Sequence, residues 1–428
     1  MKRRNFLKNL ALAPAGIPIG LGLYSPWSST MAMDYQGKFF VFVQADGGWD
    51  PTSFCDPKSN TPGELIINNW AQSQDIQQVG NLSYAPFANN AAFFQKYYDR
   101  MLVINGVDAQ TNSHSVGVVH NWSGRVSEGY PSMTALLAAA NAPDQPMAYL
   151  NFGGFGFTAN LVPSTRIDNP HQVISIAFPN QPSWDPNARF LPDTDFAALR
   201  QFQVDRANAL MAESSLAPRA LQNRTAFADA NLASEALQPF AQAIPAEQDL
   251  PSLGVQNNNL AQQAVVAAIA FKTGAAVAAD LFIGGFDTHQ DHDTNHEPLL
   301  GDLTNGVDTL WTVAEEQGIA DRLVVVIGSD FGRTNHYNAT NGKDHWPIGS
   351  YIVMEKNVSW TNRMVGFTDE LHNTYPVDPT TLVRDDANGT TIHPKHVHKA
   401  LRSYFGLDAS PLTSPYPFNN TENFAFFS

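Results

Sequence analysis

The sequence predicts an α/β protein in which helices sandwich a mainly parallel sheet. Strand-like segments alternate with helix-like segments along the 428 residues, and most of the strand-like segments are continuously apolar. A continuous apolar run is typical of a strand that is covered on both faces, as the strands of a parallel sheet are. The length is large for one hydrophobic core but usual for an α/β domain that carries insertions. We therefore expect one large domain.

Each predicted strand is a short apolar segment, and several of them end in small or turn-forming residues. The first covers residues 38–45 and runs into Asp46-Gly-Gly-Trp-Asp50. The other strands are predicted at residues 100–106, 147–152, 173–178, 275–283, 323–328 and 351–354. Glycine directly after a strand marks the turn by which the chain leaves the sheet.

Helical patterns lie between these strands. They cover residues 133–141, 196–213, 256–273, 299–317 and 395–405, and Gly406 marks the end of the last one. Residues 179–255 differ from the rest, because a cluster of Pro and Asn is followed by a long Ala- and Gln-rich helical stretch. We interpret these residues as an insertion or lid packed on the core, not as a separate domain.

The first 32 residues have the order of regions found in an export signal. Residues 2–8 read Lys-Arg-Arg-Asn-Phe-Leu-Lys, residues 9–24 are weakly apolar, and small residues lead up to Ala32. Paired arginines before such a segment are typical of the twin-arginine route. Pro14 and Pro18 break the apolar segment too often for a stable membrane-spanning helix. The alternative is a chance basic start before a frayed helix.

This pattern predicts a signal peptide at residues 1–32 and a single domain at residues 33–428. It also predicts a periplasmic or secreted location, with the twin-arginine export machinery as a partner.

Charge and cysteine content exclude some classes of function. Removal of residues 1–32 leaves 21 basic against 40 acidic residues, a net charge of about −19. Nucleic acid requires a basic surface, so no nucleic-acid partner is expected. Cys55 is the one cysteine, so no internal disulfide can form, and no partner base for a nucleophilic thiol is evident. No stretch beyond the signal reaches membrane-spanning length, so no transmembrane segment is expected in the mature chain.

Carboxylate and imidazole side chains follow several predicted strands. Asp287 and His289 follow one strand, Asp330 follows the next, and His345 comes shortly afterwards. Loops at the carboxyl ends of strands line the ligand crevice of an α/β sheet, so we expect these side chains to meet around one ion. Carboxylate and imidazole together suit zinc, manganese or iron better than calcium.

Four motifs resemble those of the DUF1501 family of exported bacterial proteins, which is placed with the alkaline phosphatase and sulfatase-like superfamily. They are Gly47-Gly-Trp-Asp50, Gly284-Gly-Phe-Asp-Thr-His289, Ser329-Asp-Phe-Gly-Arg-Thr334 and Gly342-Lys-Asp-His-Trp346. The resemblance covers nearly the whole mature chain. It implies an alkaline-phosphatase-like α/β sandwich whose sheet edge can hold metals, and it implies no particular substrate.

The resemblance also implies roles for single residues. Superfamily hydrolases use a carboxylate after the first strand, which is Asp46 or Asp50 here. The family motif favours Asp50, while Asp46 stands directly at the strand end. A hydroxyl nucleophile at a helix start falls on Ser115, with Ser113 as the second choice. A metal-bound serine needs no separate strong base, because the ion lowers its pKa.

The later metal-ligand positions of the superfamily are matched here by Asp287, His289, Asp330 and His345. Arg333 lies beside them, and a guanidinium suits a phosphate or sulfate group.

Two departures from the superfamily pattern bear on the number of ions. Asp287 and His289 are closer in sequence than usual, which makes His292 an alternative ligand. Phe331 stands where the superfamily commonly has a histidine, so one imidazole is missing. The expected cofactor is a divalent ion of zinc, manganese or iron, with one ion, two ions or a degenerate site as the alternatives.

Structural interpretations stand beside these roles. Asp46 and Asp50 could cap a turn or a helix, Ser115 could be an ordinary hydroxyl at a helix start, and Arg333 could pair with a surface carboxylate. Asp344 could orient His345 instead of binding metal.

Several other histidines are open to more than one interpretation. His114 and His120 are as well explained by packing as by metal binding. A C-terminal group could take a stray transition metal, and it consists of His393, His396 and His398.

Two functions are consistent with these observations. The first is an exported metal-dependent hydrolase of phosphate or sulfate esters, in which Ser115 attacks a small anionic ester and Arg333 stabilises the transition state. The alternative is a non-catalytic exported binding or assembly protein with a degenerate metal site.

Overall fold

The computed structural model describes residues 35–428 except 168–171, 183–184, 186, 213–219, 221–233, 246–254 and 256. The predicted signal peptide at residues 1–32 lies outside the described residues, and its role remains a prediction. Among the helices of the described part, none is both long and apolar enough to cross a membrane.

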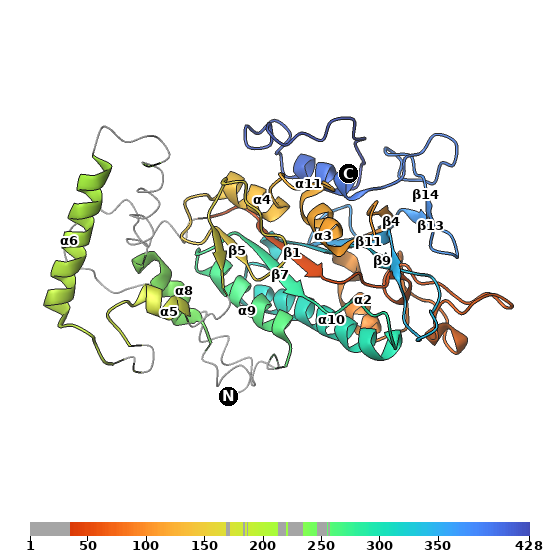
Figure 1. Ribbon diagram of the computed structural model, residues 1–428, viewed down its shortest axis with the longest axis horizontal. Coiled ribbons are helices and arrows are strands. Elements are labelled where there is room, and N and C mark those ends of the chain that lie inside the picture. The colour runs from red at the N-terminus through yellow and green to blue at the C-terminus, as the bar shows by residue number, and fades with distance from the viewer. Residues whose placement is uncertain are drawn as a thin grey trace.

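An eight-stranded sheet forms the centre of the protein (Figure 1). Its order is β12-β4-β11-β8-β1-β7-β5-β6, and every strand runs parallel to the others except β11, which is antiparallel to both of its neighbours. The bounds are β1 Phe39–Ala45, β4 Met101–Asp108, β5 Tyr149–Asn151, β6 Ser164–Arg166, β7 Ala278–Ile283, β8 Leu323–Ser329, β11 Ile348–Glu355 and β12 Arg363–Val365. All residues of β1, β8 and β11 are buried, as expected for strands covered on both faces. The predicted mainly parallel α/β fold is confirmed.

Helices cover both faces of this sheet. Figure 1 shows α2, α9 and α10 on one side and α3, α4 and α11 on the other. Helix α9 packs on β7 and on α10, whereas α4 packs on β1 and β7 and α3 packs on β8. The bounds are α2 Asn90–Tyr97, α3 His114–Ser123, α4 Met133–Asn141, α9 Asn259–Lys272, α10 His292–Glu316 and α11 Pro394–Tyr404.

Short elements complete the described chain. Three small hairpins lie outside the main sheet: β2 Gln77–Val79 with β3 Leu82–Tyr84, β9 Gly332–Arg333 with β10 His345–Trp346, and β13 Phe367–Thr368 with β14 Thr374–Tyr375. Single 3-10 turns are η1 Pro51–Ser53, η2 Trp70–Gln72, η3 Tyr98–Arg100, η4 Glu235–Leu237 and η6 Ala320–Arg322.

The register brings three strand ends level with one another. Ala45 at the end of β1 lies beside Ile283 of β7 and Ser329 of β8. Because these strands are parallel, the loops that follow them leave the sheet at one edge. The predicted site residues that follow each strand are therefore delivered to the same place.

Two predicted elements differ from the structure. The predicted strand at residues 173–178 is the helix α5 Gln172–Ala177. Its buried residues Val173 and Ala177 are four apart, which is the spacing of one helix face, while Ile176 is exposed. Helix α10 begins at His292, well before the predicted start at residue 299, and continues through Pro298. The added turns bury His292 and His296.

The predicted insertion at residues 179–255 is only partly described, and its boundaries remain a prediction. Its helix α8, Gln238–Ala243, buries Phe240 and packs against α5 and α9. Its longest helix, α6 Asp193–Met211, has no buried residue and stands away from the sheet in Figure 1. Helix α8 therefore contacts the core, and the interpretation of residues 179–255 as an insertion or lid remains a prediction.

Candidate metal centre

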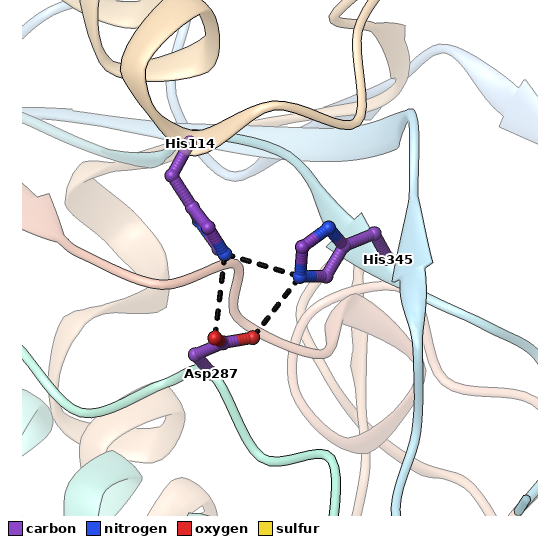
Figure 2. Close-up of side chains that lie close together, drawn as sticks. All are labelled: His114, Asp287 and His345. Atoms are coloured by element: carbon purple, nitrogen blue, oxygen red, sulfur yellow. Dashed lines mark hydrogen bonds and ion pairs between the residues drawn. The ribbon is translucent and has the colours of Figure 1, made fainter.

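Four side chains meet beyond the carboxyl ends of β1, β7 and β8. Asp287 and His289 come from the loop after β7, and His345 comes from β10. His114, the first residue of α3, reaches them from the other side of the sheet edge. Figure 2 shows His114, Asp287 and His345 pointing toward one another. We call these four residues, His114, Asp287, His289 and His345, the cluster.

The donor atoms of the cluster lie at contact distance. The Nε2 atom of His345 lies 3.0 Å from Nε2 of His114, 2.9 Å from Nε2 of His289 and 3.1 Å from Oδ1 of Asp287. Nε2 of His289 lies 3.0 Å from Oδ1 of Asp287, and Nε2 of His114 lies 3.4 Å from its Oδ2. His114, Asp287 and His345 have donor atoms that all lie within 4.8 Å of one another, as a shared metal ion requires.

Each imidazole of the cluster has an acceptor on its other nitrogen. Nδ1 of His114 lies 2.5 Å from Oδ2 of Asp330, and Nδ1 of His289 lies 2.6 Å from Oδ1 of Asp344. Nδ1 of His345 lies 2.8 Å from the carbonyl oxygen of Asn112. Carboxylates and carbonyls only accept, so each Nδ1 carries the proton, and a neutral ring then has its lone pair on Nε2.

This arrangement favours a positive charge at the centre of the cluster. Three Nε2 lone pairs and a carboxylate oxygen repel one another unless a proton or a cation lies between them. Locking Nδ1 to an oxygen acceptor is the usual support for a metal-bound histidine. The side chains of the cluster are between 24% and 46% exposed, so a solute can reach them.

Neighbouring charges and hydrogen bonds shift the pKa values of two cluster residues, His114 and Asp287. The hydrogen bond to Asp330 raises the pKa of His114 despite the opposing effect of burial, and the charges of Asp330 and Asp287 add to it. Burial pushes the pKa of Asp287 up, but the hydrogen bond and charge of Arg333, together with His345 and His114, bring it down to about 2. The carboxylate is therefore ionised and ready to face a cation.

Asp330, a predicted ligand, supports the cluster from behind. Its side chain is buried, and its Oδ1 accepts from the backbone N–H groups of Gly47 and Gly48 at 3.0 and 2.9 Å. Its Oδ2 is held by His114. Gly47 has a φ of +110°, and a Cβ there would lie 2.5 Å from the backbone nitrogen of Asp287, so the close turn requires glycine. Asp330 orients one imidazole and does not face the donor atoms.

Arg333 also lies behind the cluster. It is fully buried, and its three guanidinium nitrogens donate to the carbonyls of Gly48, Lys343 and Gly47 and to Oδ1 of Asp287, the last at 2.7 Å. The prediction gave Arg333 an anionic substrate as its partner. In the structure its partner is Asp287. The turn after β1 supplies the carbonyls of Gly47 and Gly48, which hold the guanidinium in this position.

The two carboxylates that follow β1, those of Asp46 and Asp50, lie in different places. Asp46 lies near the cluster, where burial and then the negative charge of Asp330 raise its pKa to about 6. Asp50 is fully buried in a different place, and its Oδ2 lies 2.7 Å from Nζ of Lys343 and 3.1 Å from Nε2 of His292. Burial opposes ionisation of Asp50, but Lys343 and His292 hold its pKa well below the usual value. Asp50 and the alternative ligand His292 thus belong to a second network and not to the cluster.

The predicted nucleophile stands outside the cluster. Ser115 is exposed, and its Oγ lies 3.2 Å from Oγ of Ser113, which precedes α3. The helix begins one residue later than Ser113, and this register turns His114 toward the sheet edge. Gly117 permits this close approach, because a Cβ there would lie 2.6 Å from the carbonyl oxygen of Asp330.

Phe331 occupies the place of the imidazole that the sequence lacks. Its ring centroid lies 4.8 Å from that of His114 and 4.8 Å from that of His345. An apolar ring that packs on both imidazoles leaves no donor for a second ion on that side.

The remaining candidate histidines are held singly by other groups. His120 lies 2.9 Å from the carbonyl of Ala109, and burial lowers its pKa to about 4. The three C-terminal histidines have separate partners rather than a common one: His393 with the Asp108 carbonyl, His396 with Glu422 and His398 with the Asn121 carbonyl. Packing is the interpretation that fits these four.

Sequence reasoning missed two residues of this region. His114 was left open between packing and metal binding, and its place at the start of the helix after β4 was the available signal. Lys343 was quoted within a motif and given no role. Its place just before Asp344 and His345 was a weak signal of a role in the site. Only the structure shows that Lys343 is buried against Asp50.

Comparison with known proteins gives a family and distant structural similarities. The family model described as "Protein of unknown function (DUF1501)" matches residues 38–400. No curated protein matches the chain. Solved structures that resemble it include the PsFucS1 sulfatase from Pseudoalteromonas sp., with a TM-score of 0.36, 10% identity and coverage of 80% of this chain and 68% of that chain.

Two further similar structures come from the same two classes of enzyme. The 2-O GAG sulfatase BT1596 has a TM-score of 0.34, 10% identity and coverage of 87% of this chain and 71% of that chain. A mutant of TAB5 alkaline phosphatase has a TM-score of 0.33, 10% identity and coverage of 77% and 95%. Similarity at this level transfers neither an activity nor a substrate to this chain.

Proposed function

This chain belongs to the DUF1501 family, and we propose that it is an exported, metal-dependent hydrolase of phosphate or sulfate esters. The observation that carries the proposal is the cluster, in which three imidazole Nε2 atoms and the carboxylate of Asp287 converge while each Nδ1 is bound to an oxygen acceptor. Such a set of donors at an exposed sheet edge is suited to a catalytic ion.

The donor set fits one transition-metal ion. Nitrogen and oxygen ligands of a tetrahedral zinc ion lie about 2.0–2.2 Å from it, which places them roughly 3.3 Å from one another. The distances of 2.9 to 3.4 Å among the donor atoms here are close to that value. Three imidazoles favour zinc, manganese or iron over calcium and magnesium, which prefer oxygen donors. Phe331 favours one ion over two.

The ion would be held by His114, His289, His345 and Asp287. When bound, it would supply Lewis acidity at an ester oxygen and at an attacking water. Arg333 keeps Asp287 ionised through a 2.7 Å hydrogen bond. Asp330, Asp344 and the Asn112 carbonyl keep the three imidazoles in the tautomer that offers Nε2.

A water molecule is the better candidate for the attacking group than Ser115. His114, and not a hydroxyl, occupies the helix start that faces the cluster. Asp46 lies within electrostatic reach of His114 and Asp287, and burial and the charge of Asp330 raise its pKa to about 6. Asp46 is therefore the carboxylate near the cluster to test as the group that takes up a proton.

A hollow of about 470 Å³ is lined by Gly63, Glu64, Leu65, Ile67, Asn335, His336 and Leu371. Two chain neighbours of this lining are hydrogen-bonded to the segment that carries His345: the Asp344 amide donates to Oγ1 of Thr334, and Nε1 of Trp346 donates to the carbonyl of His372. We propose this hollow as the space for the organic part of a substrate.

The second candidate function is an exported binding or assembly protein that holds a metal without catalysis. It is favoured by Arg333, whose guanidinium is occupied by protein acceptors and is therefore not available to a substrate anion. A panel of phosphate and sulfate esters separates the two functions. The protein is purified from the periplasm, its metal content is measured, and turnover is compared with that of a His289→Ala, His345→Ala double variant. Metal-dependent turnover that the variant lacks supports the hydrolase, while full metal occupancy without turnover of any ester supports the binding protein.

A further inference from the structure

A second buried network lies beside the cluster and uses none of the cluster residues. Asp50 and Lys343 form a fully buried ion pair with Oδ2 and Nζ 2.7 Å apart. Nζ of Lys343 also lies 3.2 Å from Oγ1 of Thr52 and 2.9 Å from Oδ1 of Asn68, so all three of its protons have acceptors. The pair is well satisfied, although burying two charges in the core carries a cost that packing alone does not require.

The network connects the two loops that supply most of the cluster. His292 lies with Nε2 3.1 Å from Oδ2 of Asp50 and Nδ1 2.7 Å from Oγ1 of Thr288. Thr288 stands between Asp287 and His289 in the chain.

The other end of the network reaches the same threonine. The backbone N–H of Lys343 donates to the carbonyl of Thr288 at 3.1 Å. The contacts therefore close a ring from Asp50 to His292, to Thr288, to Lys343 and back to Asp50.

We propose that the Asp50–Lys343 pair is a positioning device that fixes the loop with Asp287 and His289 against the loop with Asp344 and His345. His289 and His345 belong to different loops, yet their Nε2 atoms lie 2.9 Å apart. No hydrogen bond within the cluster sets that distance when both atoms offer lone pairs. Contacts outside the cluster hold the two loops together, and they include the hydrogen bond of His289 Nδ1 to Oδ1 of Asp344 and the backbone bond from the His292 N–H to the Asn341 carbonyl. The ring adds to them, because it ties the backbone between Asp287 and His289 to the backbone two residues before His345.

The ring can be opened without touching a cluster residue. The variants are Asp50→Asn, Lys343→Met and the double variant Asp50→Asn, Lys343→Met. Removal of one charge leaves the other buried in the core without a partner, which destabilises the fold. The double variant removes both charges and recovers stability. The matched control is Asp280→Asn. Asp280 is a fully buried carboxyl on β7 that is hydrogen-bonded to Thr134 and Tyr149 and not to the ring.

The first measurement is amide hydrogen exchange of the metal-free full mature chain. Loss of the ring should increase the exchange rate of the backbone amide at position 343 roughly tenfold or more in the double variant, with β1 and β8 still protected. The control should leave that rate unchanged. An unchanged rate at position 343 in a folded double variant would overturn the proposal, and this result does not depend on metal binding.

The second measurement is titration with Zn²⁺ alone, and this part rests on the proposed metal-dependent function. The double variant should bind Zn²⁺ about 10- to 100-fold more weakly than the wild type, although its thermal stability recovers relative to the single variants. Affinity that recovers along with stability would show a merely structural role and overturn the proposal. If the wild type binds no Zn²⁺, the proposed function fails, and the exchange rates still decide the positioning role.

Discussion

Asp330→Asn is the substitution that tests the tautomer argument most closely. Asp330 is buried and accepts from the N–H groups of Gly47 and Gly48 on one oxygen and from Nδ1 of His114 on the other. An asparagine has nearly the same shape but only one acceptor oxygen. If that oxygen keeps the two glycine N–H groups, its NH₂ group faces Nδ1 of His114.

Two donors cannot face each other, so His114 must change tautomer in this variant. Its Nδ1 then accepts, and the proton moves to Nε2, which points into the cluster. The lone pair that would bind a metal is lost from the preferred tautomer. Loss of the supporting carboxylate weakens metal binding by about 10- to 100-fold. The hydrogen bond to a charged group becomes a neutral one, which costs about 1 kcal/mol of the free energy of unfolding.

Three measurements check this prediction. Zn²⁺ titration gives the affinity, urea unfolding of the metal-free protein gives the stability, and nitrogen NMR of the imidazoles gives the tautomer of His114. Asp280→Asn serves as the control, since Asp280 is also a buried carboxyl whose pKa burial raises well above its usual value, and its hydrogen bonds are to Thr134 and Tyr149 and not to the cluster. A variant that binds Zn²⁺ as tightly as the wild type, with Nε2 of His114 still unprotonated, would refute the reasoning.

Three further predictions concern the nucleophile, pH and export. Ser115→Ala should leave ester hydrolysis within about twofold of the wild type, because Ser115 is outside the cluster, and a loss of turnover at unchanged metal content would restore Ser115 as the nucleophile. The folded-state pKa of His114 is raised, so its contribution to the stability of the metal-free protein is present below the ordinary value of about 6.5 and is lost as pH rises through the raised value. Zn²⁺ affinity should increase over the same pH range, because the proton leaves His114. A pH-independent Zn²⁺ affinity in that range would contradict this prediction. Arg3→Lys together with Arg4→Lys should hold the precursor in the cytoplasm, and an unchanged periplasmic yield in cell fractionation would rule out the twin-arginine route.

The sheet could be predicted from the sequence because its strands are continuous apolar runs. Residues 38–45 and 323–328 predicted β1 and β8 almost to the residue, since a buried strand requires apolar side chains on both faces. The segment at 173–178 has a similar composition but forms α5, because a short, mostly apolar segment satisfies either period. The direction of β11 depends on its two neighbours, which its own residues do not reveal.

The loops of the site could be located from the sequence, but the roles within them could not. Asp287, His289 and His345 meet because they follow strands that end at one edge. Asp330 belongs to the same edge, yet the two glycine N–H groups turn its carboxylate toward His114 and away from the donor atoms. A shift of a few ångströms in the side-chain oxygens decides whether such a residue binds a metal or supports a ligand. The spacing of residues along the sequence does not reveal that position.

Metal analysis with X-ray absorption tests the central claim most directly. The protein is purified without an affinity tag from the periplasm, and its metals are measured before and after loading with Zn²⁺, Mn²⁺ or Fe²⁺. We predict about one transition-metal ion per chain, with imidazole nitrogens at roughly 2.0–2.1 Å in its first shell, lost in a His289→Ala, His345→Ala variant that remains folded. A wild-type protein that stays metal-free after loading, or an ion that the variant retains, would contradict the claim that His114, Asp287, His289 and His345 form a metal centre.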